Sequence, residues 1–252
     1  SFVWQGVKKD ILFNGNHETD NKNFDQYLNS HGYKFTNNSF EAGGYVILKN
    51  KKIALVMDIG SSPEKKFSKN YQCGALSFEI ISNNNKLICN SGYFQKIKHK
   101  LNDISKSSAN HSTLIIDNHS SCKINPSNLE IVQELKILKK KVIMEKNYWS
   151  ICSSHDGYSK RYGIIHERQI EFFPENNKFI GSDKLLKKKN FKVSNFEIRF
   201  HLEPNIKIMK TQDGKSILIG IENNEGWKFT CQGYTIDIET GLYFGKKNSF
   251  TE

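Results

Sequence analysis

The densest group of side chains able to do chemistry lies between residues 154 and 168. It holds two imidazoles, two phenols and two guanidinium groups. Such groups transfer protons near neutral pH and bind planar carboxylates. The candidates for proton transfer are His155, Tyr158 and His166, and those for binding an anionic substrate are Arg161 and Arg168. In a structural alternative, the tyrosines pack in a core and the charged side chains form exposed pairs across strands.

Two of the three arginines in the chain belong to this group, and the third is Arg199. The remaining basic residues are lysines, which raise the formal net charge to +11. Lysine, asparagine and isoleucine have A/T-rich codons, so the composition of the genome is one explanation of this charge. Attraction to a polyanion is the other. The placing of the arginines is therefore more informative than the total charge.

Two further histidines are candidates for a site. His111 precedes the apolar run 112–116, where a histidine serves either as a hydrogen-bonded structural residue or as a metal ligand. Arg199 and His201 alternate with Phe200, so on a strand they would share one face and line a cleft. The alternative for Arg199 and His201 is that they are surface residues of a sheet without a functional role.

These residues need a scaffold, and the pattern from about residue 43 onward predicts strands. Short apolar or alternating segments recur between clusters of Asn, Gly, Ser and Lys, which is typical of an all-β sandwich or barrel. Two hairpins are expected, over 45–57 and 76–89. Later strands are expected at 112–116, 170–173, 196–202, 216–221, 227–231 and 234–238.

The segment 129–144 fits either a helix or strands, because Leu129, Val132, Leu135 and Leu138 recur every three residues while other apolar residues alternate. We retain strands there. Asp156 and Gly157 form a turn signal, which places His155 and Tyr158 on either side of a tight turn. His166 and Arg168 then share a face of the following strand. Residues 1–41 are expected to be an irregular linker, and residues 42–252 one antiparallel β-sandwich domain.

Composition excludes several classes of protein. No motif for binding nucleic acid is present, and no apolar run reaches the roughly 20 residues of a membrane-spanning helix. The five cysteines form no C-x-x-C pair, so we expect neither a metal finger nor a dense disulfide scaffold, and each cysteine is expected to be buried. The chain starts at Ser1 without Met or a signal peptide, which predicts a piece of a longer protein.

An ordered series of short motifs resembles the C-terminal β-sandwich domain of the heparinase II/III family of polysaccharide lyases, most of all its alphaproteobacterial branch. The motifs cover roughly residues 42–244, and they are 74–79, 87–92, 109–114, His155-Asp156-Gly157-Tyr158, His166-Glu167-Arg168, 181–185, Arg199-Phe200-His201-Leu202 and 225–229. The resemblance implies an upstream helical toroid, of which 1–41 is the remnant. It also implies β-elimination on a uronate-containing polysaccharide in a cleft of which the sandwich forms one wall.

The resemblance also implies a structural zinc site, from which this sequence departs. Many members carry His-x-His-Ala-Asp where this chain has residues 70–74, and an Asp where it has Asn90. The corresponding ligands would be Gln72, Asn90 and His111, and amides are weak zinc ligands. A hydrogen-bonded network of these three side chains is the alternative to a zinc site, so no cofactor is firmly expected.

Three functions stay open. The first is the lyase domain, which the family places in the cell envelope or periplasm of a Gram-negative bacterium. The second is a non-catalytic glycan-binding or structural sandwich, and the third is a general polyanion binder that depends on lysine.

Overall fold

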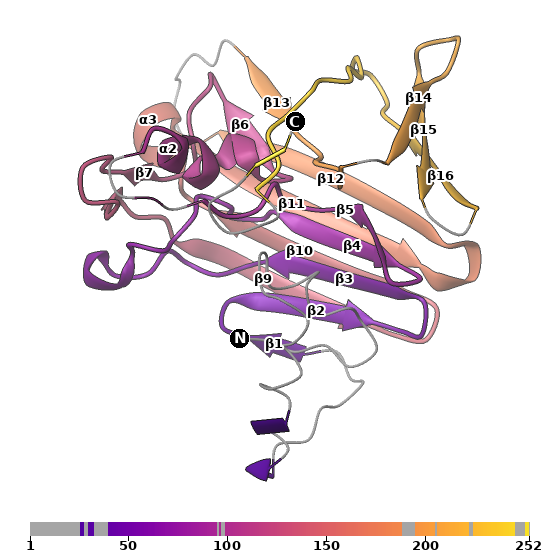
Figure 1. The fold of residues 1–252 in the computed structure, drawn as a ribbon, viewed down its shortest axis with the longest axis horizontal. Helices are drawn as coiled ribbons and strands as arrows, with labels where there is room; N and C mark the ends of the chain where they lie inside the picture. The colour runs from indigo at the N-terminus through magenta and orange to yellow at the C-terminus, as the bar shows by residue number, and fades with distance from the viewer. Residues whose placement is uncertain are drawn as a thin grey trace.

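The structure is a computed structural model that describes residues 26–27, 30–32, 40–94, 96, 99–187, 195–204, 206–221, 224–244 and 250–251. Antiparallel strands dominate it (Figure 1). The expected linker over 1–41 lies mostly outside the described residues. Phe40–Ala42, at its boundary, form strand β1. No helix in the described part of the chain is long and apolar enough to cross a membrane.

Two sheets form an antiparallel β-sandwich, as the sequence predicts. The first has the order β1-β2-β3-β4-β5, and the second β12-β11-β10-β9. In Figure 1 the first sheet lies in front of the second. The strands of the first sheet are β1 (Phe40–Ala42), β2 (Tyr45–Lys49), β3 (Ile53–Asp58), β4 (Phe78–Ser82) and β5 (Asn85–Ile88). Those of the second are β9 (Ile137–Met144), β10 (Trp149–His155), β11 (Ile164–Phe173) and β12 (Lys178–Lys187).

Local turn chemistry closes the two expected hairpins. The Asn50 side-chain oxygen accepts hydrogen bonds from the amides of Lys52 and Ile53, which fixes the turn between β2 and β3. Asn83 and Asn84 both have positive φ, as two-residue hairpin turns require. Segment 129–144 contains β8 (Ile131–Gln133) and β9, so the strand interpretation is confirmed there.

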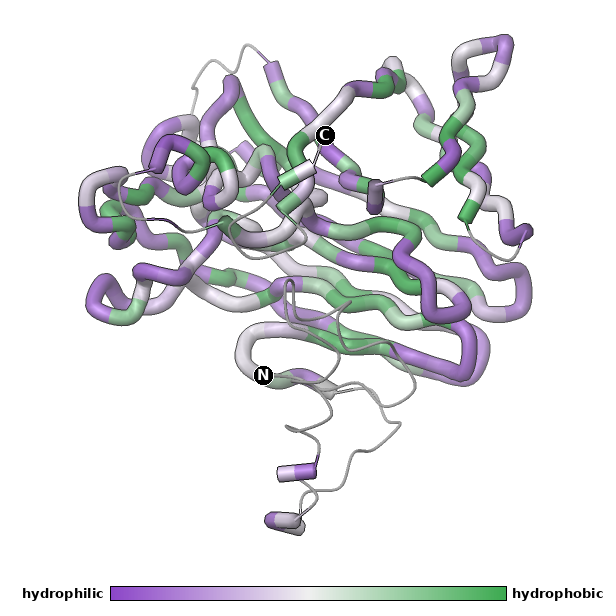
Figure 2. The backbone as a smooth tube through the Cα atoms, in the orientation of Figure 1, coloured by the Kyte–Doolittle hydropathy of each residue, from purple (hydrophilic) through white to green (hydrophobic). Residues whose placement is uncertain are grey.

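The main core lies between the sheets, where apolar side chains of β2 to β5 meet Trp149, Ile151, Ile170 and Phe172. Figure 2 shows the hydrophobic stretches along the strands and hydrophilic turns at their ends. A third sheet adds Ile217 and Ile219 to this core. It consists of β14 (Lys207–Lys210), β15 (Ser216–Ile221) and β16 (Glu225–Thr230).

Short elements gather at one end of the sandwich (Figure 1). They carry the loops described below. They are η2 (Lys65–Phe67), α2 (Leu101–Lys106), η3 (Ser108–Asn110), the pair β6 (Leu114–Ile116) and β13 (Phe196–Ile198), the pair β7 (Lys123–Ile124) and β8, and α3 (Ser159–Tyr162). The short helix η4 (Pro174–Asn176) connects β11 to β12.

Two expectations were wrong. The strand expected over 234–238 does not form, because the described residues give this segment no partner strand and Gly233 before it has positive φ. Tyr234 and Ile238 are 67% and 45% exposed, so the alternation does not create a buried face. The cysteines also differ from expectation, because Cys231 is exposed. Cys73 and Cys122 are buried, as expected, and form a disulfide with each other. Cys89 and Cys152 are buried free thiols, as expected.

Candidate functional site

The turn after β10 brings His155 and His166 together. Strands β10 and β11 pair so that these two residues lie opposite each other, and the amide of Ser159 closes the turn onto the Asp156 carbonyl at 2.8 Å. Every second residue of β11 is buried, so His166 and Arg168 both point into the sandwich. The expected turn and shared face are therefore confirmed. Strand β12 places Asp183 opposite Arg168, which the sequence analysis did not foresee.

A chain of hydrogen bonds runs through the two imidazoles. The Gly157 amide donates to His155 Nδ1 at 3.0 Å, which leaves the proton of that ring on Nε2. His155 Nε2 then donates to His166 Nδ1 at 3.2 Å, and His166 Nε2 donates to Asp183 Oδ1 at 2.6 Å. Every ring nitrogen is used, and both rings are buried. Both imidazoles must therefore be neutral, since an added proton would displace a donor.

Arg168 connects these hydrogen bonds to the loops that precede β4 and β6. Its Nε and Nη2 donate to the two oxygens of Asp183 at 2.7 and 3.1 Å. Its Nη1 donates to the carbonyls of Leu76 and Ser112 at 2.9 and 2.7 Å. The guanidinium carbon lies 5.4 Å from the centre of the Phe78 ring. The side chain is only 2% exposed, so the pair is a buried, hydrogen-bonded ion pair. We name His155, His166, Arg168 and Asp183 the sandwich network.

The electrostatics agree with this protonation pattern. Burial lowers the pKa of His155 well below its usual range, and the nearby His166 and Arg168 side chains add to the effect. Burial also lowers the pKa of His166, although Asp183 opposes this. For Asp183, burial alone would raise the pKa, but Arg168 and His166 hold it well below the usual value. The network therefore contains one carboxylate, one guanidinium and two neutral imidazoles.

The hydroxyls of both tyrosines of the cluster have partners within the protein. The Tyr158 hydroxyl donates to the Leu114 carbonyl at 2.7 Å, and the Tyr162 hydroxyl lies 2.9 Å from His119 Nδ1. Both rings are buried, which fits the packing alternative. Arg161 is exposed and lies 5.8 Å from the Tyr162 ring. The roles of His155, Tyr158 and His166 in catalysis, and of Arg161 and Arg168 in substrate binding, stay predictions, and of these five side chains only Arg161 is exposed.

A second polar cluster forms where four loops meet, and we name it the loop site. It brings together Gln72, Asn90, His111 and His201. His111 Nε2 lies 3.1 Å from Gln72 Oε1, and Asn90 Oδ1 accepts a hydrogen bond from the amide of Ser112 at 2.9 Å. The Ser112 hydroxyl donates to the Cys89 carbonyl and accepts from the His201 amide. The structure therefore unites side chains that are up to 129 residues apart in the sequence.

These side chains do not fit a zinc site. His111 Nδ1 lies 2.8 Å from the Ser107 carbonyl, so both ring nitrogens already have protein partners. Asn90 directs its oxygen to a backbone amide. Within the described residues, no group of three or more His, Cys, Asp or Glu side chains is arranged to hold a metal ion. Burial lowers the pKa of His111 to about 4, so this ring is neutral at physiological pH.

His201 and Arg199 do not share a strand face, because β13 ends at Ile198. His201 Nδ1 lies 2.8 Å from the Ser91 hydroxyl, and its Nε2 lies 2.9 Å from the Ala109 carbonyl. Arg199 instead binds Glu197, with Nη2 at 2.9 Å from Oε2. The expectation of a common strand face was therefore wrong. Their roles in substrate binding stay predictions.

The loop site reaches the surface through a rim that the sequence analysis missed. The Tyr93 hydroxyl donates to Asn70 Oδ1 at 3.2 Å, and Asn70 is exposed while Tyr93 is half-buried. Gln72 Nε2 donates to the Gly92 carbonyl at 3.4 Å, which joins the rim to the buried part. Burial raises the pKa of Tyr93, so its phenol keeps its proton. The only signal for this tyrosine in the sequence was the neighbouring run Asn90-Ser91-Gly92, which belongs to the motif 87–92.

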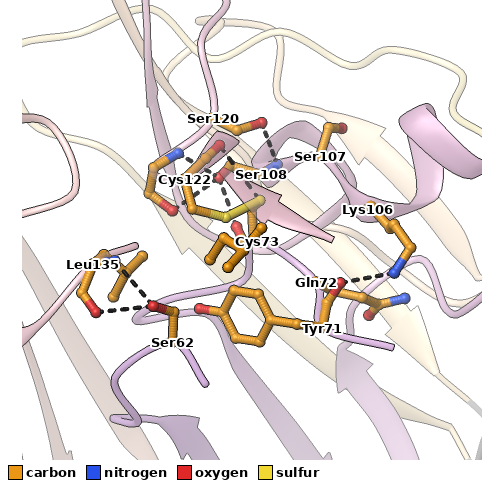
Figure 3. Close-up of a disulfide and its surroundings, with 12 residues drawn as sticks. Ser62, Tyr71, Gln72, Cys73, Lys106, Ser107, Ser108, Ser120, Cys122 and Leu135 are labelled. Carbon is orange, nitrogen blue, oxygen red and sulfur yellow. Dashed lines mark hydrogen bonds between the residues drawn. A yellow bond between two sulfur atoms is a disulfide. The ribbon is translucent and has the colours of Figure 1, made fainter. Parts of the chain in front are cut away.

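Three buried links hold the segment that carries Asn70 and Gln72 (Figure 3). The Lys106 ammonium donates to the carbonyls of Lys69 and Tyr71 at 2.7 and 2.9 Å. The Cys73–Cys122 disulfide follows immediately, and the Ser108 hydroxyl donates to the Cys73 carbonyl at 2.6 Å. The segment is thus fixed by a cation, a covalent bond and a hydroxyl.

Comparison with known proteins identifies this arrangement of sheets and loops. The model of the heparinase II/III-like C-terminal domain matches residues 34–252. The chain belongs to this family. A solved heparinase III with methylated lysines is similar to 99% of this heparinase II/III-like domain, with a TM-score of 0.65 and 16% sequence identity. At that identity the likeness concerns the fold alone. The domain spans 38% of that chain. No curated protein matches its sequence.

Proposed function

We propose that this chain is the C-terminal domain of a polysaccharide lyase that cleaves uronate-containing glycans by β-elimination. The observation that carries the proposal is the family match over residues 34–252, which comprises the whole sandwich. In the proposed enzyme the sandwich forms one wall of the substrate cleft, and an upstream helical toroid forms the other. The catalytic step removes the C5 proton, forms the C4–C5 double bond and expels the C4 oxygen, which takes up a proton.

The rim of the loop site is the part of the domain best suited to contact a glycan. Asn70 and Tyr93 offer a side-chain amide and a phenol that solvent can reach. The phenol keeps its proton, so it is able to donate a hydrogen bond to a glycan oxygen or to protonate a leaving oxygen. The sandwich network, in contrast, is enclosed between the sheets. We therefore assign it a supporting role.

A non-catalytic glycan-binding sandwich is the second candidate. The observation that favours it is the enclosure of the two histidines of the loop site, since every ring nitrogen of His111 and His201 lies within 3.1 Å of a protein atom. In this case the rim binds the glycan and no bond is broken.

The proposed location is the cell envelope or periplasm of a Gram-negative bacterium. The disulfide supports it independently of the family, because such bonds persist in oxidising compartments and are rare in the cytosol.

The decisive experiment measures the absorbance of unsaturated uronate products. The full-length protein is incubated with a panel of acidic glycans, sulfated and unsulfated. The Tyr93→Phe and Tyr148→Phe variants are assayed in the same way. Tyr148 is the matched control, because its hydroxyl binds Glu171 on the second sheet. We expect product with at least one glycan and a loss of kcat in Tyr93→Phe alone. Absence of product with every glycan would reject the lyase. Salt-sensitive glycan binding without product would then establish the non-catalytic alternative.

A further inference from the structure

One nitrogen of Arg168 joins the two backbone segments that build the loop site. Its Nη1 donates to the carbonyl of Leu76, four residues after Gln72, and to the carbonyl of Ser112, directly after His111. The Thr113 hydroxyl ties the same segments together through the Ala75 carbonyl at 2.9 Å. The relative position of Gln72 and His111 therefore depends on a side chain that belongs to the opposite sheet.

The Leu76 end of this link holds an unfavourable backbone conformation. Leu76 has φ of 59°, in the left-handed region, although it is a fully buried leucine. For a residue with a β-carbon this conformation is unfavourable, so the surroundings must hold it in place. The Leu76 amide donates to the Asp58 carbonyl at 2.9 Å, and Arg168 binds the Leu76 carbonyl. Both polar groups of the strained residue are thereby fixed.

At the other end, Ser112 connects Arg168 to the rest of the loop site. Its carbonyl binds Arg168, its amide binds Asn90, and its hydroxyl binds both the Cys89 carbonyl and the His201 amide. A shift of the guanidinium would therefore move Ser112, together with His111 before it in the chain and His201, whose amide it binds. Asp183 fixes the orientation of the guanidinium through two parallel hydrogen bonds.

We propose that Arg168 and Asp183 are positioning residues of the loop site, which set the mutual orientation of Gln72 and His111 from the opposite sheet. This inference rests on the proposed function only in taking the loop site as the functional site. It does not require that the protein cleave a glycan. Lysine cannot replace Arg168, because a single ammonium lacks the planar fork that binds Asp183 and two carbonyls together.

The test is NMR of this chain labelled with 15N-histidine, together with backbone amide spectra. We expect Arg168→Lys and Asp183→Asn to shift the His111 ring nitrogens and the amides of Ser112 and Gln72. The control is Glu225→Gln, because Glu225 binds Ser82, Asn83 and Trp227, away from the loop site. The control is expected to lower stability without shifting His111.

If the single variants do not fold, a double variant without buried charge provides the test. Arg168→Met combined with Asp183→Asn leaves no unpaired ion, so a stable fold is expected. It also leaves the carbonyls of Leu76 and Ser112 without their donor, so His111 should shift again. If the folded variants lose stability while the His111 signals stay at their wild-type positions, the positioning role is disproved. A failed lyase assay would leave this result unchanged.

Discussion

The sandwich network and the loop site are both built around a pair of histidines, but they differ in their access to solvent. In the network, His155 and His166 bind each other, and the chain ends on a carboxylate and a backbone amide. In the loop site, His111 and His201 also have a protein atom beside every ring nitrogen, but Gln72 leads outward to the half-buried Tyr93 and the exposed Asn70. The dense group of chemical residues in the sequence is thus buried apart from Arg161, while a sparse group reaches the surface.

The largest expected effect on stability comes from adding a β-carbon at Gly157, in the turn next to His155 of the sandwich network. A β-carbon at Gly157 would lie 2.2 Å from the Ser121 carbonyl oxygen and 3.0 Å from His155 Nδ1. The first contact is with backbone, which cannot move without disturbing the neighbouring loop. We expect Gly157→Ala to lower the free energy of unfolding by about 3–5 kcal/mol, measured by urea denaturation.

The control for this variant is Gly181→Ala on β12, where a β-carbon meets no atom within 4 Å. Its stability should stay within about 1 kcal/mol of wild type. Equal losses in the two variants would show that the turn is not a special constraint.

The disulfide provides the next largest effect, on the side of the loop site. It closes a sequence separation of 49 residues, so its removal increases the entropy of the unfolded chain. We expect Cys73→Ser combined with Cys122→Ser to lower the free energy of unfolding by about 2–4 kcal/mol. In the same urea titration, a reducing agent should lower the free energy of unfolding of wild type by a similar amount. It should leave that of the double variant unchanged. A reductant effect on the variant would point to another source.

Acid should weaken the protein through both regions. Burial lowers the pKa of His111, His155 and His166, so the folded state keeps them neutral while the unfolded state binds protons below about pH 6.5. The stabilisation is therefore complete above that pH and is lost as the pH falls. Each such histidine adds about 1.4 kcal/mol per pH unit to the slope of the unfolding free energy.

The variant His111→Asn isolates the contribution of the loop site to this pH dependence. Asparagine keeps a donor near the Ser107 carbonyl but does not titrate, so the slope between pH 6 and 5 should decrease by about 1.4 kcal/mol per pH unit. A slope equal to that of wild type would mean that His111 is not held neutral.

The sequence predicted the parts of this structure that depend on local patterns. The hairpins have turn residues at their tips, and the alternation of β11 placed His166 and Arg168 on one face. The partners of Arg168 were beyond prediction, because Asp183 comes from the next strand and the two carbonyls from loops before β4 and β6. The pairing of Cys73 with Cys122 likewise depends on loops that only the fold brings together.

The rim was missed for a related reason. Asn70 and Tyr93 are ordinary residues in the sequence, and their significance arises from the hydrogen bond between two separate loops. Residues of strongly chemical type, by contrast, drew attention wherever they lay in the chain. Burial then decided which of them solvent can reach.

The disulfide also makes the loop site part of a covalent ring. Asn90, Tyr93, Lys106 and His111 all lie between Cys73 and Cys122 in the chain. The exposed lysines Lys96 and Lys100 lie on the same ring. A protease that cuts after either lysine would therefore open the ring without releasing a fragment. The cleaved protein would keep both halves of the loop site until the disulfide is reduced.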